Sequence, residues 1–208
     1  MGDVEIAALC DLNEERLHAI ADEYGVPDRY TSYEEMFAKA GLTAVSVCTP
    51  NKLHAEVSVK ALEAGLHVLC EKPLASAADL AQQISDARDK HDRIFMMGYQ
   101  RRYGLPAQHL KDRIDRGDFG EIYFARCWWV RRSGIPGMGG WFTNRKLSGG
   151  GVLQDTIPKF EDVSEFELET SHFVECTRAG KQPVSTAEQG KMAVDLIERI
   201  YREGESNL

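Results

Sequence analysis

Residues 45–75 read VSVCTPNKLHAEVSVKALEAGLHVLCEKPLA. Apolar runs at Ala44–Cys48 and His67–Cys70 enclose Leu53–Ala64, in which apolar residues recur with helical spacing. A strand, a helix and a second strand in this order predict two parallel strands joined by a crossover helix. The second strand stops at an acid, a base and a proline, Glu71-Lys72-Pro73. We therefore expect polar chemistry where this buried strand reaches the edge of its sheet.

The same alternation continues on both sides of this unit. Because the apolar runs are almost uninterrupted, the sheet is expected to be parallel, with both faces covered by helices. The further predicted elements are strands at Val4–Cys10 and Ile94–Gly98, helices at Asn13–Tyr24 and Tyr33–Ala40 (N-cap Ser32), and a helix from its N-cap Ser76 to about His91. The sequence thus predicts an α/β fold built on a parallel sheet.

The pattern changes after Tyr99. Glu121–Arg131 alternates apolar and polar residues, which predicts a longer strand. Helical spacing predicts three further helices: Leu105–Arg116, Phe160–Arg178, and Thr186–Glu203 with Ser185 as N-cap and Glu188 completing a capping box. We therefore place a domain boundary near Gln100, between an α/β part and an α+β part.

The composition excludes several classes of partner. The 208 residues are 43% hydrophobic and carry a formal net charge of −8, which argues against nucleic acid and anionic membranes, because both attract clustered lysine and arginine. No apolar run approaches the ~20 residues of a membrane helix. The five cysteines are odd in number and include no CxxC pair, so we expect reduced thiols, no metal site and a cytoplasmic setting.

Asp11 ends the first predicted strand. A carboxylate at such a strand end binds the ribose hydroxyls of a dinucleotide and repels a 2′-phosphate. Leu12 and Asn13 follow, not a basic residue, so the position favours NAD over NADP. The alternative is a helix N-cap, which is the commoner role of a lone aspartate.

The next two strand ends carry further candidates. Thr49 and Asn51, around Pro50, either contact a ligand or only form the turn and cap the following helix. Lys72 is placed to be desolvated, which lowers the pKa of a lysine and suits proton transfer with a hydroxyl group, and Glu71 is placed to tune it. The alternative for this acid and base is a surface ion pair worth at most ~1 kcal/mol.

Four segments together resemble one family, the Gfo/Idh/MocA oxidoreductases, which include glucose–fructose oxidoreductase and inositol dehydrogenase. They are ALCDLNEERL (8–17), residues 45–75, GYQRRY (98–103) and GGGVLQD (149–155). The resemblance implies a Rossmann-type, dinucleotide-binding domain at residues 1–99 and an α+β substrate and oligomerisation domain at residues 100–208. It also implies NAD as cofactor, a sugar or polyol as substrate, and a homo-oligomer, either a dimer or a tetramer.

The resemblance assigns roles residue by residue. Lys72 contacts the reacting hydroxyl or carbonyl group and Asp155 completes the catalytic group, while the peptide before Pro73 is often cis in the family. The cofactor-binding positions are Asp11, Thr49, Pro50, Asn51, His54, Glu71, Lys72 and Gln100. Arg102 and Trp141 correspond to substrate-binding positions.

Two departures from the family pattern stand out. No G-x-G-x-x-G turn, which would hold the pyrophosphate at a helix N-terminus, precedes Asp11. Lys159 stands where the family has a histidine after Asp155, and much of the second-domain sheet is absent, with a break in the pattern near residues 157–161. We expect a chain that lacks the first Rossmann strand with its glycine-rich loop, and part of the second domain.

Three functions are compatible with these residues. The first is an NAD(P)-dependent oxidoreductase that transfers hydride between a sugar or polyol hydroxyl and the nicotinamide. The second is an NAD-dependent glycoside hydrolase of the same family. The third is a non-catalytic, truncated paralogue that acts as a binding subunit.

Overall fold

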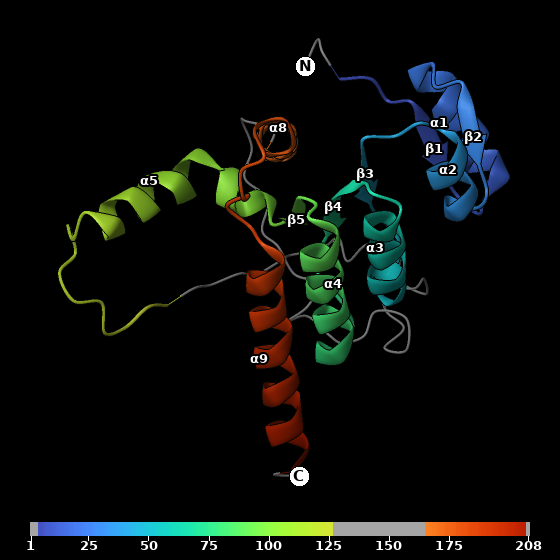
Figure 1. The fold of residues 1–208 in the computed structure, drawn as a ribbon. Coiled ribbons are helices and arrows are strands. Elements are labelled where there is room, and N and C mark those ends of the chain that lie inside the picture. The colour runs from blue at the N-terminus through green and yellow to red at the C-terminus, as the bar shows by residue number, and fades with distance from the viewer. Residues whose placement is uncertain (1–3, 127–164, 207–208) are drawn as a thin grey trace.

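The computed structural model describes residues 4–126 and 165–206. At its centre lies a parallel sheet in the order β3-β4-β5, formed by Ala44–Val47, His67–Glu71 and Phe95–Gly98 (Figure 1). In this sheet Glu71 lies opposite Gly98. The three strands confirm those predicted from the apolar runs. Their parallel pairing brings all three carboxyl ends to one edge of the sheet.

Helices cover both faces of this sheet. α3 (His54–Glu63) and α4 (Ala78–His91) pack against each other on one face, and α8 (Glu165–Ala179) lies on the other (Figure 1). The strand residues alternate accordingly. The α3–α4 face buries Val68, Cys70, Phe95 and Met97, and the α8 face buries Leu69 and Met96 together with Phe173 and Cys176. This two-sided burial explains why residues 68–70 and 95–97 are apolar without interruption.

The last helix, α9 (Ala187–Ser206), packs along α4. Its first turns reach the central core, because Ala187 and Val194 are buried there. Gly190 permits the close approach: a Cβ atom at this position would lie 3.0 Å from the Cβ of Leu74 and 3.1 Å from the Cγ of Met97. The end of the chain therefore completes the core of its first part, and the division at residues 99 and 100 stays a prediction.

A second, two-stranded parallel sheet lies to the side of the first (Figure 1). It pairs β1 (Ala8–Cys10) with β2 (Asp28–Tyr30), and α1 (Glu14–Tyr24) and α2 (Tyr33–Lys39) lie beside it. The sequence did not predict β2, because its three residues are polar or aromatic and lie at an exposed edge. The predicted first strand is also shorter than expected, since residues 4–7 are irregular.

The helix caps are partly as predicted. Ser32 caps α2, accepting the backbone N–H of Glu35 at 3.2 Å. Ser76 was the wrong cap for α4. The helix begins two residues later, and the backbone N–H of Ala78 donates to Oε1 of Glu198 on α9 at 2.8 Å. A carboxylate distant in sequence replaces the local cap, which no local pattern reveals.

Ser185 was also assigned wrongly as an N-cap. Its hydroxyl group donates to the carbonyl oxygen of Met97 at 2.7 Å, and the Met97 N–H donates to the Ser185 carbonyl oxygen at 2.9 Å. Ser185 is therefore bonded to the edge of β5. Thr186 and Gln189 form the capping pair of α9 instead, with backbone-to-side-chain distances of 3.3 and 3.4 Å.

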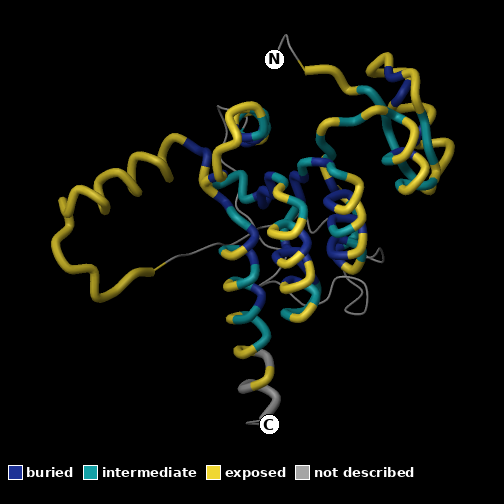
Figure 2. The backbone as a smooth tube through the Cα atoms, viewed as in Figure 1, coloured by how far each residue is buried: buried dark blue, intermediate teal, exposed yellow. Residues whose placement is uncertain are grey.

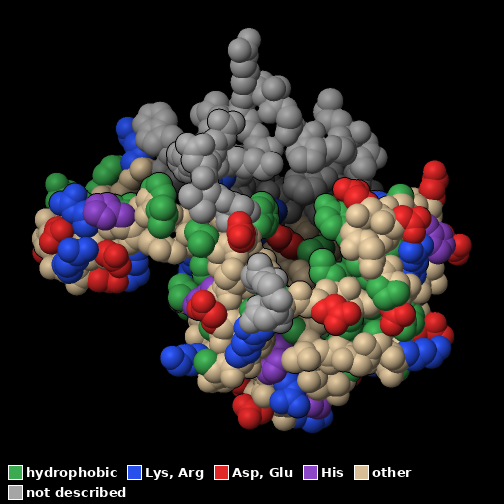
Figure 3. Space-filling view, turned by 90° about the horizontal axis from the view of Figure 1, so that it is seen from above, with side chains coloured by type: hydrophobic (Ala, Val, Ile, Leu, Met, Phe, Trp, Pro, Cys, Tyr) green, Lys and Arg blue, Asp and Glu red, His purple; other side chains and the backbone are tan. Residues whose placement is uncertain are grey.

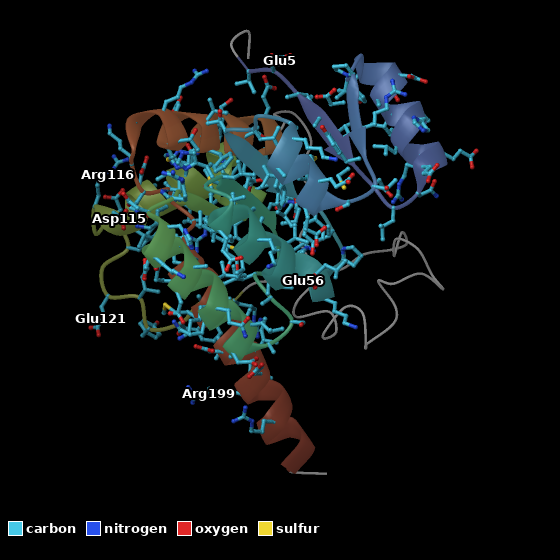
Figure 4. The ribbon with its side chains drawn as sticks, turned by 45° about the vertical axis from the view of Figure 1, so that its right-hand side comes forward. Glu5, Glu56, Asp115, Arg116, Glu121 and Arg199 are labelled. Carbon is cyan, nitrogen blue, oxygen red and sulfur yellow. The ribbon has the colours of Figure 1, made fainter. Side chains whose placement is uncertain are left out.

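The helix predicted at Leu105–Arg116 is present as α5 (Leu105–Asp115), which follows the short helix η2 (Gln100–Tyr103) and runs outward from the sheet. None of its residues is buried, as its exposed backbone in Figure 2 shows. Asp115, Arg116 and Glu121 lie at the outer end of α5 and in the segment that follows it (Figure 4). The strand predicted at Glu121–Arg131 is wrong for residues 121–126, which are irregular and exposed, and its remainder lies outside the described residues. No helix in the described ranges is both long and apolar enough to cross a bilayer.

Candidate functional site

Three short segments follow the carboxyl ends of β3, β4 and β5. They contain Thr49–Asn51, Glu71–Pro73 and Tyr99–Arg102, which include most of the residues singled out from the sequence. Neighbouring parallel strands end at the same edge, so these segments are adjacent in space. Seen from above, the surface has a hollow near its middle in which acidic side chains are visible (Figure 3). The edge of the sheet is therefore a site of polar side chains on an apolar scaffold.

Glu71 and Lys72 lie at the end of the central strand. Oε2 of Glu71 accepts the backbone N–H of Lys72 at 3.2 Å. Burial raises the pKa of the Glu71 carboxyl group above its ordinary value, although the Lys72 N–H and the Lys72 charge oppose this shift. Gly98 permits a close approach to the backbone of β4, because a Cβ there would lie 3.2 Å from the carbonyl oxygen of Cys70 and from the Cα of Glu71. The Lys72–Pro73 peptide bond is cis, as the resemblance implies.

His54 joins two of the three segments. Its side chain is buried, with 1% of its surface exposed. Nδ1 lies 2.6 Å from the carbonyl oxygen of Pro73, and Nε2 lies 2.7 Å from that of Thr49. Both partners are acceptors, so the ring donates to one of them when neutral and to both when protonated. His54 therefore acts on the site by holding the segments after β3 and β4 together.

Thr49 and Gln100 are the residues at this edge that best fit a bound ligand. Oγ1 of Thr49 and Oε1 of Gln100 are buried, and neither makes a hydrogen bond in the structure. Buried polar atoms are normally paired, so unpaired ones at a sheet edge mark places where a ligand or water supplies the partner. Thr49 follows β3 and Gln100 follows β5, so they lie on either side of the β4 end that carries Glu71. Asn51, also buried, begins η1 (Asn51–Leu53) beside them, after Pro50.

Asp11 lies at the end of β1, on the smaller sheet. It is not the helix cap, because Asn13 caps α1 by accepting the Arg16 N–H at 2.9 Å. Both Asp11 carboxylate oxygens accept hydrogen bonds from the Arg16 guanidinium group, at 2.6 to 2.9 Å. The carboxylate is thus held at the strand end by a residue inside the following helix. The sequence placed Arg16 in that helix but did not predict the pairing.

Arg102 points toward α9. Its Nη1 donates to Oε1 of Gln189 at 2.6 Å and to the carbonyl oxygen of Val184 at 3.2 Å. Its guanidinium carbon lies 5.4 Å from the centre of the Tyr99 ring. In the described residues this arginine therefore connects η2 to the start of α9. Its predicted contact with substrate stays a prediction.

The sequence did not single out Glu169 on α8. Only 2% of its surface is exposed, and its Oε1 is buried without a hydrogen-bond partner. The pKa of its carboxyl group is raised to about 8, first by burial and then by the nearby charges of Glu71 and Glu165. One signal was available, because Glu169 shares the buried stripe of its helix with Phe173 and Cys176 at spacings of four and seven residues.

The remaining predicted residues cannot be placed at this edge. Asp155, Lys159 and Trp141 lie outside the described residues, as does the break expected near residues 157–161. The described part of the site therefore consists of the strand-end segments of the three-stranded sheet, Asp11 on the smaller sheet and the acidic side chains of α8.

Known proteins resemble this chain in sequence and in fold. Among curated proteins, the D-glucoside 3-dehydrogenase of Escherichia coli (strain K12) is 37% identical over 153 residues, which are 74% of this chain and 43% of that enzyme. The chain spans less than half the length of the curated relatives it matches.

Among solved structures, a levoglucosan dehydrogenase in complex with NADH and levoglucosan is 25% identical. It aligns with a TM-score of 0.61 over 72% of this chain and 41% of that structure. The aldose-aldose oxidoreductase of Caulobacter crescentus, solved with glycerol, aligns with a TM-score of 0.81. That alignment covers 98% of this chain and 90% of that structure at 19% identity, and therefore establishes a shared fold.

Residues 2–99 match the family GFO_IDH_MocA, described as "Oxidoreductase family, NAD-binding Rossmann fold". This range contains the three-stranded sheet, the smaller sheet and the segments that carry Asp11, Thr49, His54 and Lys72. Residues 2–99 therefore belong to the Gfo/Idh/MocA family of oxidoreductases with an NAD-binding Rossmann fold.

Proposed function

We propose that this chain is the cofactor-binding part of an NAD-dependent oxidoreductase that acts on a CH–OH group of a sugar or polyol. The observation that carries the proposal is the sheet edge at which Lys72 and Glu71 lie between the unpaired polar atoms of Thr49 and Gln100. The relatives named above act on glucosides and sugars according to their names. The substrate class and the NAD requirement are transferred from those relatives as part of this proposal.

Each residue has a distinct task in the proposed reaction. A nicotinamide held at this edge would supply the acceptor for the hydride of the substrate carbon. Lys72 binds the reacting hydroxyl group and takes its proton, with Asp155 as its predicted partner. Thr49 and Gln100 supply hydrogen-bonding groups to the cofactor, and Glu71 sets the charge beside Lys72.

His54 and Asp11 have supporting roles in this arrangement. His54 fixes the distance between the segments after β3 and β4, so that the positions of Thr49 and Lys72 are coupled. Asp11 binds the ribose of the adenosine and repels a 2′-phosphate, which favours NAD over NADP. A cytoplasmic setting and a homo-oligomer belong to the same proposal. The free thiols of Cys10, Cys48, Cys70 and Cys176 are compatible with a reducing compartment.

Cofactor binding is the first test. Titration of the chain with NADH and with NADPH, followed by nicotinamide fluorescence, is expected to show tighter binding of NADH. A chain that binds neither nucleotide contradicts the oxidoreductase and leaves the non-catalytic binding subunit. A chain that releases an alcohol from glucosides without net formation of NADH favours the glycoside hydrolase.

Lys72→Met tests the catalytic role. The variant is expected to bind NADH as the unchanged chain does, while its turnover of aldoses, glucosides or inositols falls by about 100-fold or more, as is typical for loss of a general base. Lys52→Met is the matched control, because Lys52 is exposed on η1 in the neighbouring segment. Unchanged turnover in the Lys72 variant would falsify the assigned role.

A further inference from the structure

Both carboxylate oxygens of Asp11 are already engaged. Oδ1 accepts the backbone N–H of Asn13 at 2.8 Å and Nη2 of Arg16 at 2.8 Å. Oδ2 accepts Nε and Nη2 of Arg16 at 2.9 and 2.6 Å. The guanidinium fork therefore covers the carboxylate, which is the group assigned to the ribose of a dinucleotide.

A ribose and Arg16 compete for the same two oxygens. The neighbouring 2′- and 3′-hydroxyl groups of a ribose donate to both oxygens of such a carboxylate, as the guanidinium group does here. Asp11 itself is held in place, because its backbone N–H donates to the carbonyl oxygen of Tyr30 on β2 at 3.1 Å. When a ribose binds, Arg16 is therefore the group that has to move.

Arg16 can move at little cost. Its side chain is 66% exposed, against 29% for the side chain of Asp11. An ion pair this open to solvent contributes little free energy, because water and salt screen it and both side chains lose freedom in forming it. The pair thus fills the ribose site without closing it, so Asp11 remains available to a dinucleotide.

The displaced guanidinium group stays close to whatever Asp11 binds. Arg16 lies in the first turn of α1, five residues after Asp11, so its backbone is fixed beside the strand end. Glu14 and Glu15 share this turn and disfavour an anion. Arg29 on β2 is engaged elsewhere, since it pairs with Asp22 on α1 at 2.6 Å. Arg16 is therefore the cation placed to meet a phosphate group on the ribose.

We propose that Arg16 is a specificity residue that exchanges Asp11 for the 2′-phosphate of NADPH, so that the chain accepts NADPH as well as NADH. The planar guanidinium fork that now matches a carboxylate matches a phosphate equally well. With NADH, the released Arg16 gains no partner, and the competition weakens binding. The inference rests on the proposed function for the ribose at Asp11, and it narrows the preference for NADH without reversing it.

Arg16→Met tests the exchange by nucleotide titration at constant ionic strength. The Kd of NADH should fall by about threefold, because a competing exposed ion pair is lost. The Kd of NADPH should rise by about tenfold, as expected when a phosphate loses a charge-assisted hydrogen bond. A merely structural role of Arg16 would weaken both nucleotides together. Equal shifts for NADH and NADPH, or no shift, overturn the proposal.

Two further variants complete the test. Arg113→Met is the matched control, because Arg113 forms an exposed pair with Asp118 at the same five-residue spacing on and after α5, and its loss should leave both Kd values unchanged. Arg16→Lys keeps the charge without the fork and covers the case in which Arg16→Met does not fold, as judged by circular dichroism. The ratio of the NADPH Kd to the NADH Kd should rise in Arg16→Lys, and an unchanged ratio overturns the proposal.

Nucleotides without a nicotinamide separate this inference from the proposed function. Calorimetry with adenosine 5′-monophosphate and adenosine 2′,5′-bisphosphate should show that Arg16→Met loses affinity for the bisphosphate alone. If this result is obtained but NADH does not bind, the proposed function fails while the role of Arg16 stands. If NADH binds and Arg16→Met treats both adenosine phosphates alike, this inference fails alone. If no nucleotide binds, both fail.

Discussion

His54 shows how one buried side chain determines the geometry of the site. Pro73 lies 19 residues after His54, and Thr49 lies five residues before it, yet the imidazole reaches both carbonyl oxygens. A ring fixed by two buried contacts has little freedom, so the segments after β3 and β4 move together.

His54→Ala is therefore expected to lower the free energy of unfolding by about 2–4 kcal/mol, since it removes the contacts with one buried and one partly buried carbonyl oxygen and opens a cavity. Urea denaturation measures this change. His109→Ala is the matched control, because His109 is exposed on α5 and surface changes are usually within about 0.5 kcal/mol. Equal midpoints for the two variants would mean that His54 does not hold the segments together.

At the residue scale, the sequence predicted the site residues that directly follow a strand. It did not predict the site residue that lies on a helix distant in sequence. Thr49, Lys72 and Gln100 follow apolar runs, so their place at one edge follows from parallel pairing alone. Glu169 lies instead on α8, much further along the chain than these segments. Only the charge in its buried stripe indicated an unusual position.

At the scale of elements, long apolar runs and helical spacing predicted β3, β4, β5 and the helices between them, because buried strands and amphipathic helices leave strong patterns. The caps were harder to predict. Ser76 and Ser185 have the right chemistry for an N-cap, but Glu198 caps α4 and Ser185 is bonded to β5. The type of residue next to a helix does not indicate which distant side chain folding places at the N-terminus of that helix.

Glu198→Ala is expected to destabilise the chain by about 1 kcal/mol, because the first N–H group of α4 loses its acceptor. Glu198→Gln is the matched comparison. It keeps a carbonyl oxygen at the same place and should retain most of the stability. Thermal unfolding of both variants, followed by the circular dichroism of their helices, measures the difference. Equal losses in the two variants would show that the charge, not the hydrogen bond, stabilises the junction of α4 and α9.

At the scale of the whole molecule, the raised pKa of Glu169 links folding to pH. The folded chain keeps a proton on this acid up to about pH 8, whereas an ordinary glutamate loses it near 4.5. Between these values the folded state binds more protons than the unfolded state, so this group makes stability fall as pH rises.

We therefore expect the free energy of unfolding to decrease from pH 5 to pH 8 through this group, and Glu169→Gln to flatten that slope. Urea unfolding at a series of pH values, with Glu175→Gln in parallel, measures it. The same slope in Glu169→Gln and in the unchanged chain would place the proton on another group.

The bonding of Ser185 to Met97 has a consequence for association between molecules. An edge strand exposes unpaired N–H and C=O groups to which another chain can add, which is a common route to aggregation. β5 is the edge strand of the three-stranded sheet, and Ser185 occupies both the N–H and the C=O of Met97 there. Among the described residues, Ser185 therefore occupies the pairing groups of Met97, so that a further strand could not bind β5 at this position without displacing it.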